Sequence, residues 1–265
     1  MRGKLAISAF GIALFISSGA AAKSASRVLL RDNVSPAHRD QLTNKLRKIT
    51  GWTKLTFAGD GTLVIGSTDT APGETERGTI SQGSKSARSL LAKAVGGDNV
   101  IILEDASSRP DVAFCRVVPG RWINADSARL PAYVVLIDFT DFEQIVGDEA
   151  ARESFDVGWA VLHEIDHVVT DSEDRDDPDE VGECESHINK MRDELGLPLR
   201  ASYFFTVSAL KADRNFNTLF VRLPFEQKDP SSRRLKRYWL TWDFAVVGGL
   251  SSPLNRLARS SADIF

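Results

Sequence analysis

The segment from residue 157 to residue 169 places the strongest constraint on the fold, because its apolar residues repeat at the spacing of a buried helix. Four of them fall on one side, which would face the core: Val157, Val161, Ile165 and Val168. On the opposite side, "HEIDH" sets His163 and His167 four residues apart, so their Cβ atoms would lie about 5–6 Å apart on one face. The chain has only four histidines, and half of them fall in this pattern. The sequence therefore predicts a helix whose apolar side packs on the core and whose opposite side carries two neighbouring imidazoles.

Two imidazoles one helical turn apart are suited to hold a metal ion. Neutral imidazole is a good zinc ligand, whereas Glu164 points about 100° away from His163 and cannot join it as a ligand. Its carboxylate can instead reach a water on the ion, which is the geometric basis of the H-E-x-x-H pattern: two ligands and a general base. The alternative is a helix that carries two surface histidines, one of them beside a carboxylate.

The pattern of His163, Glu164 and His167 resembles that of the zincin metallopeptidases, over about residues 155 to 203. The metzincin extension is absent, because Thr170 stands in place of its glycine and Glu173 in place of its third histidine. The branch with a glutamate on the following helix fits better. "VGECESHINKMRDELGLPLR" supplies such a helix, with a buried stripe of five residues: Val181, Cys184, Ile188, Met191 and Leu195. The resemblance implies an α+β fold: a single zincin-like domain with a mixed sheet, the histidine helix and the glutamate helix.

The third zinc ligand has several candidates on that second helix. One local pattern resembles a glutamate-helix motif and favours Glu183, with His187 as its outer partner; a related pattern favours Glu185, with Asn189 four residues later. We expect Glu183, and keep Glu185 as the alternative. His187 itself and an aspartate from the acidic loop at residues 171–180 also stay open. That loop has no glycine at the place an EF-hand needs one, so a solvated acidic loop is favoured over a calcium site.

Other residues of this region could serve the reaction or the packing of the fold. Zincins often use a Tyr, His or Arg to stabilise the tetrahedral oxyanion, and Tyr203, Arg200 and His187 are the candidates here. Cys184 falls on the buried stripe, which favours ordinary core packing. Cys115 and Cys184 are the only two cysteines, and in an oxidising compartment they could form one bridge.

The N-terminus predicts export. Arg2 and Lys4 precede an apolar run, and alanines 20 to 22 offer an A-x-A cleavage site, which together are typical of a signal peptide at residues 1–22. The mature chain, residues 23–265, would begin near Lys23 and form a single metallopeptidase-like domain in the periplasm or outside the cell. No later stretch approaches the length of a spanning helix, so we expect no stable membrane insertion. With 33 basic and 36 acidic residues, the chain is mildly acidic, which argues against nucleic acid as a partner.

The rest of the chain alternates helix and strand signals. Ser35-Pro36 predicts a helix start and Gly51 its end, and a second helix ends at Gly96-Gly97. We further expect a hairpin around residues 59–61, strands in 99–103, 111–118 and 132–139, a short helix at 142–146 and a strand pair at 203–210 and 217–225. The segment "RRLKRYWLTWDF" from residue 233 could bind a polyanion, but a strand with one charged face is the favoured interpretation.

Together these patterns favour an exported zinc peptidase that holds one Zn²⁺ and acts on a peptide or protein substrate. His163 and His167 would hold the ion with a glutamate, and Glu164 would act as the general base on a zinc-bound water. The alternative is a zinc-stabilised exported binding protein without turnover. A third possibility is an exported scaffold that holds no metal and whose helices serve packing alone.

Overall fold

The computed structural model describes residues 27–66, 83–107, 109–125, 128–174, 181–202, 206–209, 219–229, 231–232, 234–243 and 246–248. The predicted signal peptide at residues 1–22 and the predicted mature start at Lys23 lie outside these residues. Within the described part, no helix has the length and apolar character needed to cross a bilayer.

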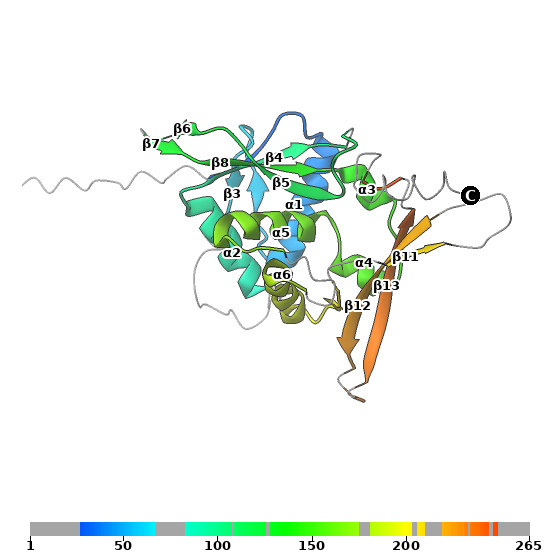
Figure 1. The fold of residues 1–265 in the computed structure, drawn as a ribbon. Coiled ribbons are helices and arrows are strands. Elements are labelled where there is room, and N and C mark those ends of the chain that lie inside the picture. Colours follow the sequence, from blue (N-terminus) through cyan, green and yellow to red (C-terminus); the bar gives the residue numbers. More distant parts are fainter. Residues whose placement is uncertain are drawn as a thin grey trace, which may run out of the picture.

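A four-stranded mixed sheet forms one layer of the molecule (Figure 1). Its strands are β1 (Val28–Leu30), β4 (Val100–Asp105), β8 (Ala132–Ile137) and β5 (Cys115–Pro119), in the order β1-β4-β8-β5. The first three run parallel, and β5 runs antiparallel along β8. The central strands are apolar runs, as expected for parallel strands that are covered by helices. The expected α+β fold with a mixed sheet is confirmed.

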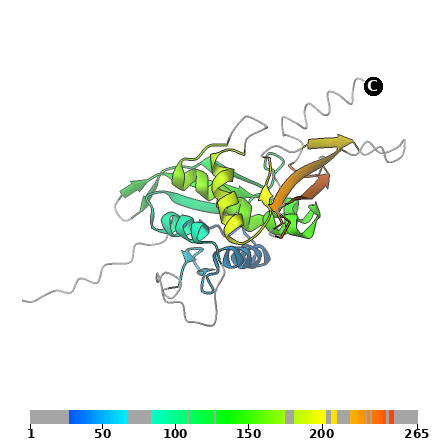
Figure 2. The same ribbon diagram turned by 90° about the horizontal axis from the view of Figure 1, so that it is seen from below.

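Helix α5 (Val157–Thr170) packs on this sheet, and three helices pack around α5: α1 (Pro36–Thr50), α2 (Lys85–Gly96) and α6 (Glu183–Glu194). Helix α5 is central, because it contacts β5 and β8 as well as α1, α2 and α6. Figure 2 shows α1, α2 and α6 spread over the face that α5 covers. The helix that carries the two histidines is therefore held on all sides by other elements.

The ends of α1 and α2 follow from their capping residues. The Ser35 side chain accepts a hydrogen bond from the His38 N–H, Pro36 opens α1, and Gly51 closes it in the left-handed conformation at φ 72°. Ser84 caps α2 in the same way, and α2 ends at Gly97. The predicted start and end of α1 and the predicted end of α2 are confirmed.

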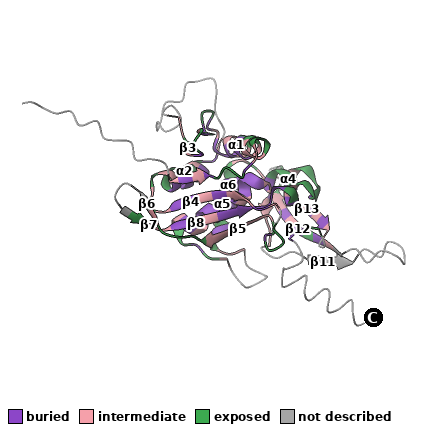
Figure 3. Ribbon diagram, turned by 90° about the horizontal axis from the view of Figure 1, so that it is seen from above, coloured by how far each residue is buried: buried purple, intermediate pink, exposed green. Residues whose placement is uncertain are grey.

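Helix α5 is buried around most of its circumference (Figure 3). The predicted apolar side is confirmed, since Val157, Val161 and Ile165 are at most 1% exposed. Trp159 and Leu162 are equally buried on the other sides. Because buried residues lie on every side of α5, including His163 and Glu164 at 9% exposed, the histidines lie in a covered site and not on an open helix face.

A second, antiparallel sheet contains the C-terminal strands. Its strands are β10 (Leu199–Arg200), β12 (Leu219–Lys228), β13 (Leu235–Asp243) and β9 (Val146–Gly147), with β11 (Thr206–Ala209) also paired to β12. The β11–β12 register matches the strand pair expected from the sequence. β13 confirms the predicted strand, and its Arg237 forms an ion pair with Glu226 on β12. The inner face packs around Val221, Phe225 and Leu240 beside α4 (Glu149–Ser154).

Three local expectations differ from the structure. The short helix is α3 (Phe139–Glu143), because the Asp138 side chain caps it earlier than the sequence suggested, and Val146 lies instead in β9. Helix α4 was not expected. Strand β5 begins only at Cys115, because Phe114 adopts a left-handed conformation with φ 59° that no continuing strand allows.

Two small hairpins complete the fold. The first pairs β2 (Thr56–Phe57) with β3 (Leu63–Val64), as expected, and the second pairs β6 (Ile123–Ala125) with β7 (Ala128–Leu130).

Candidate metal centre

Helix α5 brings the two histidine rings together. Their ring centroids are 4.8 Å apart with an interplanar angle of 84°, and their Nε2 atoms are 3.2 Å apart. Two nitrogens bound tetrahedrally at about 2.0–2.1 Å from one zinc ion would be roughly 3.3–3.4 Å apart. The spacing of the two Nε2 atoms therefore fits a shared metal ion.

The opposite ring nitrogens determine which atom of each histidine can bind a metal. The Nδ1 of His167 lies 2.7 Å from the Ser172 carbonyl oxygen, which can only accept, so Nδ1 carries the proton. The Nδ1 of His163 lies 3.3 Å from a carboxylate oxygen of Glu185 and donates toward it. Both Nε2 atoms then present lone pairs to the same point. Such outer partners fix the tautomer and the ring orientation of metal-binding histidines.

A third candidate ligand comes from the loop that follows α5. Asp171 ends the helix in the left-handed conformation at φ 55° and turns the chain back toward the histidines. Asp174 then places Oδ1 at 3.3 Å from the Nε2 of His163 and Oδ2 at 3.4 Å from the Nε2 of His167. The carboxylate thus faces both imidazoles at the spacing of ligands around one ion. Of the acidic loop, residues 175–180 lie outside the described part.

Cys184, in the first turn of α6, completes a group of four. One ligand atom from each of His163, His167, Asp174 and Cys184 lies within 4.8 Å of the others. Cys184 is fully buried, and its thiol donates to the His163 carbonyl oxygen at 3.3 Å. Both cysteines of the chain are free thiols, so the bridge between Cys115 and Cys184 is absent. Two imidazoles, one carboxylate and one thiol form a donor set suited to zinc more than to magnesium or calcium.

The electrostatics of this group favour a positive charge between the side chains. Burial lowers the pKa of His163, but hydrogen bonds to Asp174, Cys184 and Glu185 outweigh burial and raise it well above its usual range. The same balance, with burial opposed by Asp174 and Cys184, raises the pKa of His167 to about 11. The acceptor groups that face the two rings therefore favour a positive charge at this place.

Glu164 lies between α5 and β5. Its Oε2 accepts a hydrogen bond from the Val117 N–H at 2.8 Å. Burial raises the pKa of the Glu164 carboxyl, and the neighbouring His163 and His167 partly offset this effect. A carboxylate whose pKa is raised toward neutrality is better matched to accept a proton and return it.

Neither glutamate expected as the third ligand reaches the metal-facing nitrogens. Glu183, the preferred choice, is exposed at the start of α6 and is not in the group of four. Glu185 is 1% exposed, but its carboxylate contacts the Nδ1 side of His163 together with Arg192 and Arg200. The group that could hold a metal therefore contains Asp174 and not the expected Glu183, and Glu185 contacts His163 on its Nδ1 side.

Glu185 belongs to a buried charge cluster that the sequence analysis did not foresee. Burial alone would raise the pKa of its carboxyl, but Arg192 and Arg200 hold it well below the usual range. Arg192 is also fully enclosed, and donates its Nε to the Ser154 carbonyl oxygen at 2.8 Å. Asn189 joins by accepting from Arg192 at 2.8 Å. The pattern of Glu185 followed by Asn189 therefore has a structural role in this chain.

The residues considered for oxyanion stabilisation are placed differently. The Nδ1 of His187 pairs with Asp166 Oδ2 at 2.8 Å, and the same carboxylate oxygen accepts from the Ser172 hydroxyl at 2.9 Å. His187 thus supports the loop whose Ser172 carbonyl orients His167. Arg200 is held by Glu185 at 3.0 Å. Tyr203 lies outside the described residues.

Asp174 and Cys184 are the site residues that the sequence analysis placed in other roles. The loop was expected to be solvated, and its aspartate ligand was only one of the open alternatives. Cys184 was assigned to packing because it falls on the apolar stripe of its helix. The apolar stripe could have indicated the role of Cys184, because the face of α6 that packs on α5 is also the face nearest the histidines.

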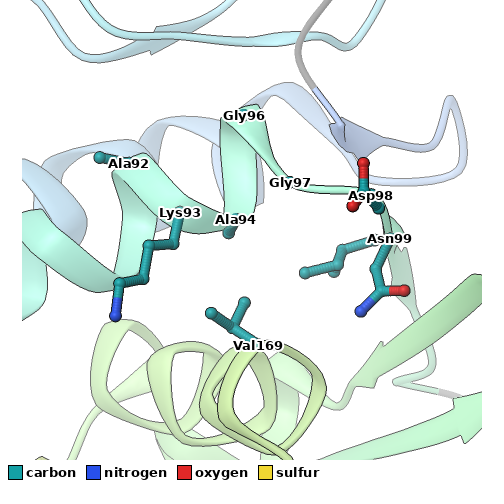
Figure 4. Close-up of a pocket in the computed structure, with 9 residues that line it drawn as sticks. Ala92, Lys93, Ala94, Gly96, Gly97, Asp98, Asn99 and Val169 are labelled. Atoms are coloured by element: carbon teal, nitrogen blue, oxygen red, sulfur yellow. The ribbon is translucent and has the colours of Figure 1, made fainter.

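A separate hollow of about 600 Å³ lies at the C-terminal end of α2 (Figure 4). In Figure 4, Val169 projects from α5 toward the turn at Gly96 and Gly97. Asn99 borders the hollow and donates its Nδ2 to the Val168 carbonyl oxygen at 3.0 Å, which satisfies one of the last carbonyls of α5. No residue of the group of four lines this hollow, so it is distinct from the candidate metal centre.

Compared with protein-family models, with curated proteins and with solved structures, the chain matches none of them. The contacts among His163, His167, Asp174, Cys184 and Glu164 are therefore the basis for a functional interpretation.

Proposed function

We propose that this chain is an exported zinc peptidase whose ion is held by His163, His167 and Asp174. The observation that carries the proposal is the convergence of the two Nε2 atoms, 3.2 Å apart, with the Asp174 carboxylate at 3.3 and 3.4 Å. The third ligand is then an aspartate from the loop, which favours a zincin-like centre outside the glutamate-helix branch. Export rests on the signal-like residues 1–22.

The donor chemistry and its surroundings fit zinc. Each imidazole has its Nδ1 hydrogen directed to a fixed acceptor, the Ser172 carbonyl for His167 and the Glu185 carboxylate for His163. These partners leave the Nε2 lone pairs aimed at one point, with little rearrangement needed on binding. Zinc bound there would supply a Lewis acid that polarises a carbonyl group and acidifies a water molecule.

Glu164 is placed to act as the general base. Its Oε2 is held by the Val117 N–H, and Oε1 accepts no hydrogen bond from the described residues. Burial against α5 and β5 raises the pKa of the carboxyl. Glu164 would therefore take a proton from the attacking water and deliver it to the leaving amine.

The edge of the first sheet offers a place for a peptide substrate. β5 pairs with β8 on one side, and no other described strand pairs with it on the other. The Val117 N–H is directed to Glu164 and so points away from β8. An extended peptide added along this edge would lie beside the proposed base, and main-chain hydrogen bonds of this kind bind peptides of many sequences.

One observation favours a second function, a zinc-stabilised binding protein without turnover. Cys184 supplies a fourth donor, and four protein ligands are typical of structural zinc sites, whereas catalytic sites keep one position for water. Only the peptidase needs Glu164 as a base.

The substitution Glu164→Gln separates the two functions. It keeps the shape and the hydrogen bond from Val117 but removes the base, so we expect normal zinc content with hydrolysis reduced by about 10²–10⁴-fold. Cleavage of a mixed peptide library, followed by mass spectrometry, measures the change. Equal cleavage by zinc-loaded wild type and variant would exclude Glu164 as the base, and a zinc-loaded wild type that cleaves nothing would favour the binding protein.

A further inference from the structure

We propose that the Cys184 thiolate is a fourth ligand that closes the metal centre in the resting protein and competes with water for the last coordination position. The inference deepens the proposed function and rests on the same metal centre. It assigns to Cys184 a role in control of the site, in place of the core packing that its position on the α6 stripe first suggested.

The position of Cys184 follows from the way α6 docks. The helix begins after Gly182, whose φ of 77° turns the chain into its first residues. Its buried stripe of Cys184, Ile188 and Met191 packs against α5. Cys184 is the first member of that stripe, so it lies at the end of α6 where Asp174 arrives from the loop.

The neighbours of Cys184 on α6 are directed elsewhere. Glu183 is exposed, and Glu185 is bound by Arg192 and Arg200 on the Nδ1 side of His163. Cys184 alone among these three belongs to the group of four ligand atoms. Its sulfur lies within 4.8 Å of the ligand atoms of His163, His167 and Asp174. The thiol thus faces the side of the histidines on which the metal would bind.

The centre would have two states, which differ in the arrangement of this one side chain. In the structure the thiol donates to the His163 carbonyl oxygen at 3.3 Å, an arrangement that leaves three ligands and one position for water. If the thiol proton passed to solvent and the sulfur bound the metal, four protein ligands would surround the ion and leave no position for water. Glu164 would then have no water to deprotonate, and the protein would be latent.

Cobalt substitution tests the ligand directly, because a thiolate bound to Co²⁺ gives an intense charge-transfer absorption that nitrogen and oxygen ligands do not give. We expect this absorption in the cobalt-loaded wild type and in Cys115→Ala, which removes the other thiol. Cys184→Ser should lose it while keeping the weaker visible bands of cobalt held by His163, His167 and Asp174. A wild type without the absorption, or a Cys184→Ser variant that retains it, would overturn the proposal.

Zinc affinity and activity provide the second readout, with Cys184→Ala as a further variant should serine disturb folding. If the thiolate is a ligand, its loss should weaken zinc binding by more than the roughly 10–100-fold that outer partners contribute. At saturating zinc the variants should hydrolyse peptides several-fold faster than wild type, because no sulfur competes with water for the last coordination position. An unchanged affinity contradicts the proposal. The charge-transfer absorption without hydrolysis in any variant would support a thiolate-closed centre and overturn the peptidase.

Discussion

The hydrogen bonds to the two Nδ1 atoms decide the chemistry of the histidines at the scale of single residues. His167 is oriented by a backbone carbonyl, whereas His163 is oriented by Glu185, a carboxylate that two arginines keep charged. A buried carboxylate of this kind is stable only with its partners in place. Orientation of His163 therefore depends on a charge cluster that lies behind the metal centre.

Glu185→Gln tests this cluster, with Glu183→Gln as the matched control two residues earlier on α6. Removing the Glu185 charge leaves the enclosed Arg192 without a charged partner, so we expect a loss of about 3–5 kcal/mol in the free energy of unfolding. The exposed control should stay within about 0.5 kcal/mol of wild type. Urea denaturation at pH 7 measures both, and equal midpoints would contradict the role of Glu185.

The same pair of proteins predicts a pH dependence. The pKa of Glu185 is lowered in the folded state, so its stabilising effect is complete above its unfolded pKa and is lost as the pH falls toward the folded value. The difference in stability between wild type and Glu185→Gln should therefore be largest near neutral pH and shrink below about pH 4.5. A difference that grows on acidification would contradict this assignment.

At the scale of elements, the end of α5 controls whether a third ligand reaches the histidines. Asp171 stops the helix in the left-handed conformation, and the following residues bring Ser172 to His167 and Asp174 to both imidazoles. Asp166 holds this loop through the Ser172 hydroxyl and is itself paired with His187 on α6. The centre thus depends on one turn between two packed helices.

Two substitutions at Asp171 test that turn. Asp171→Gly keeps the left-handed conformation at no steric cost, so zinc affinity and stability should stay close to wild type. Asp171→Val forces a β-branched residue into the same conformation, which costs about 1–2 kcal/mol and displaces Asp174. Zinc titration should show weaker binding in the valine variant alone. Similar affinities in both variants would contradict a loop direction set by Asp171.

The helix pattern was predictable because it depends on local spacing. The apolar repeat and the histidine spacing of α5 are properties of neighbouring residues, and so are the caps of α1 at Ser35 and Gly51. The positions of Asp174 and Cys184 were not predictable in this way. Asp174 depends on a left-handed residue at Asp171, and the direction of the Cys184 sulfur depends on how α6 docks on α5.

At the scale of the whole molecule, the centre lies where three segments meet beneath the mixed sheet. Helix α5 supplies two candidate ligands, the loop after it a third, and α6 the thiol, while β5 borders Glu164. Because these segments come together only in the folded chain, metal binding at this centre would be coupled to folding. The second sheet lies against α4 and contributes no residue to the group of four.

Zinc content is the most direct test of the central claim that His163, His167 and Asp174 hold the ion. Wild type, Asp174→Ala and Glu183→Ala would be purified without added zinc, and metal per chain and zinc affinity measured at one pH. We predict about one zinc per chain in wild type and Glu183→Ala, and a loss of affinity in Asp174→Ala larger than the roughly 10–100-fold typical of outer partners. Zinc retained by Asp174→Ala but lost from Glu183→Ala, or a wild type without zinc, would contradict the account.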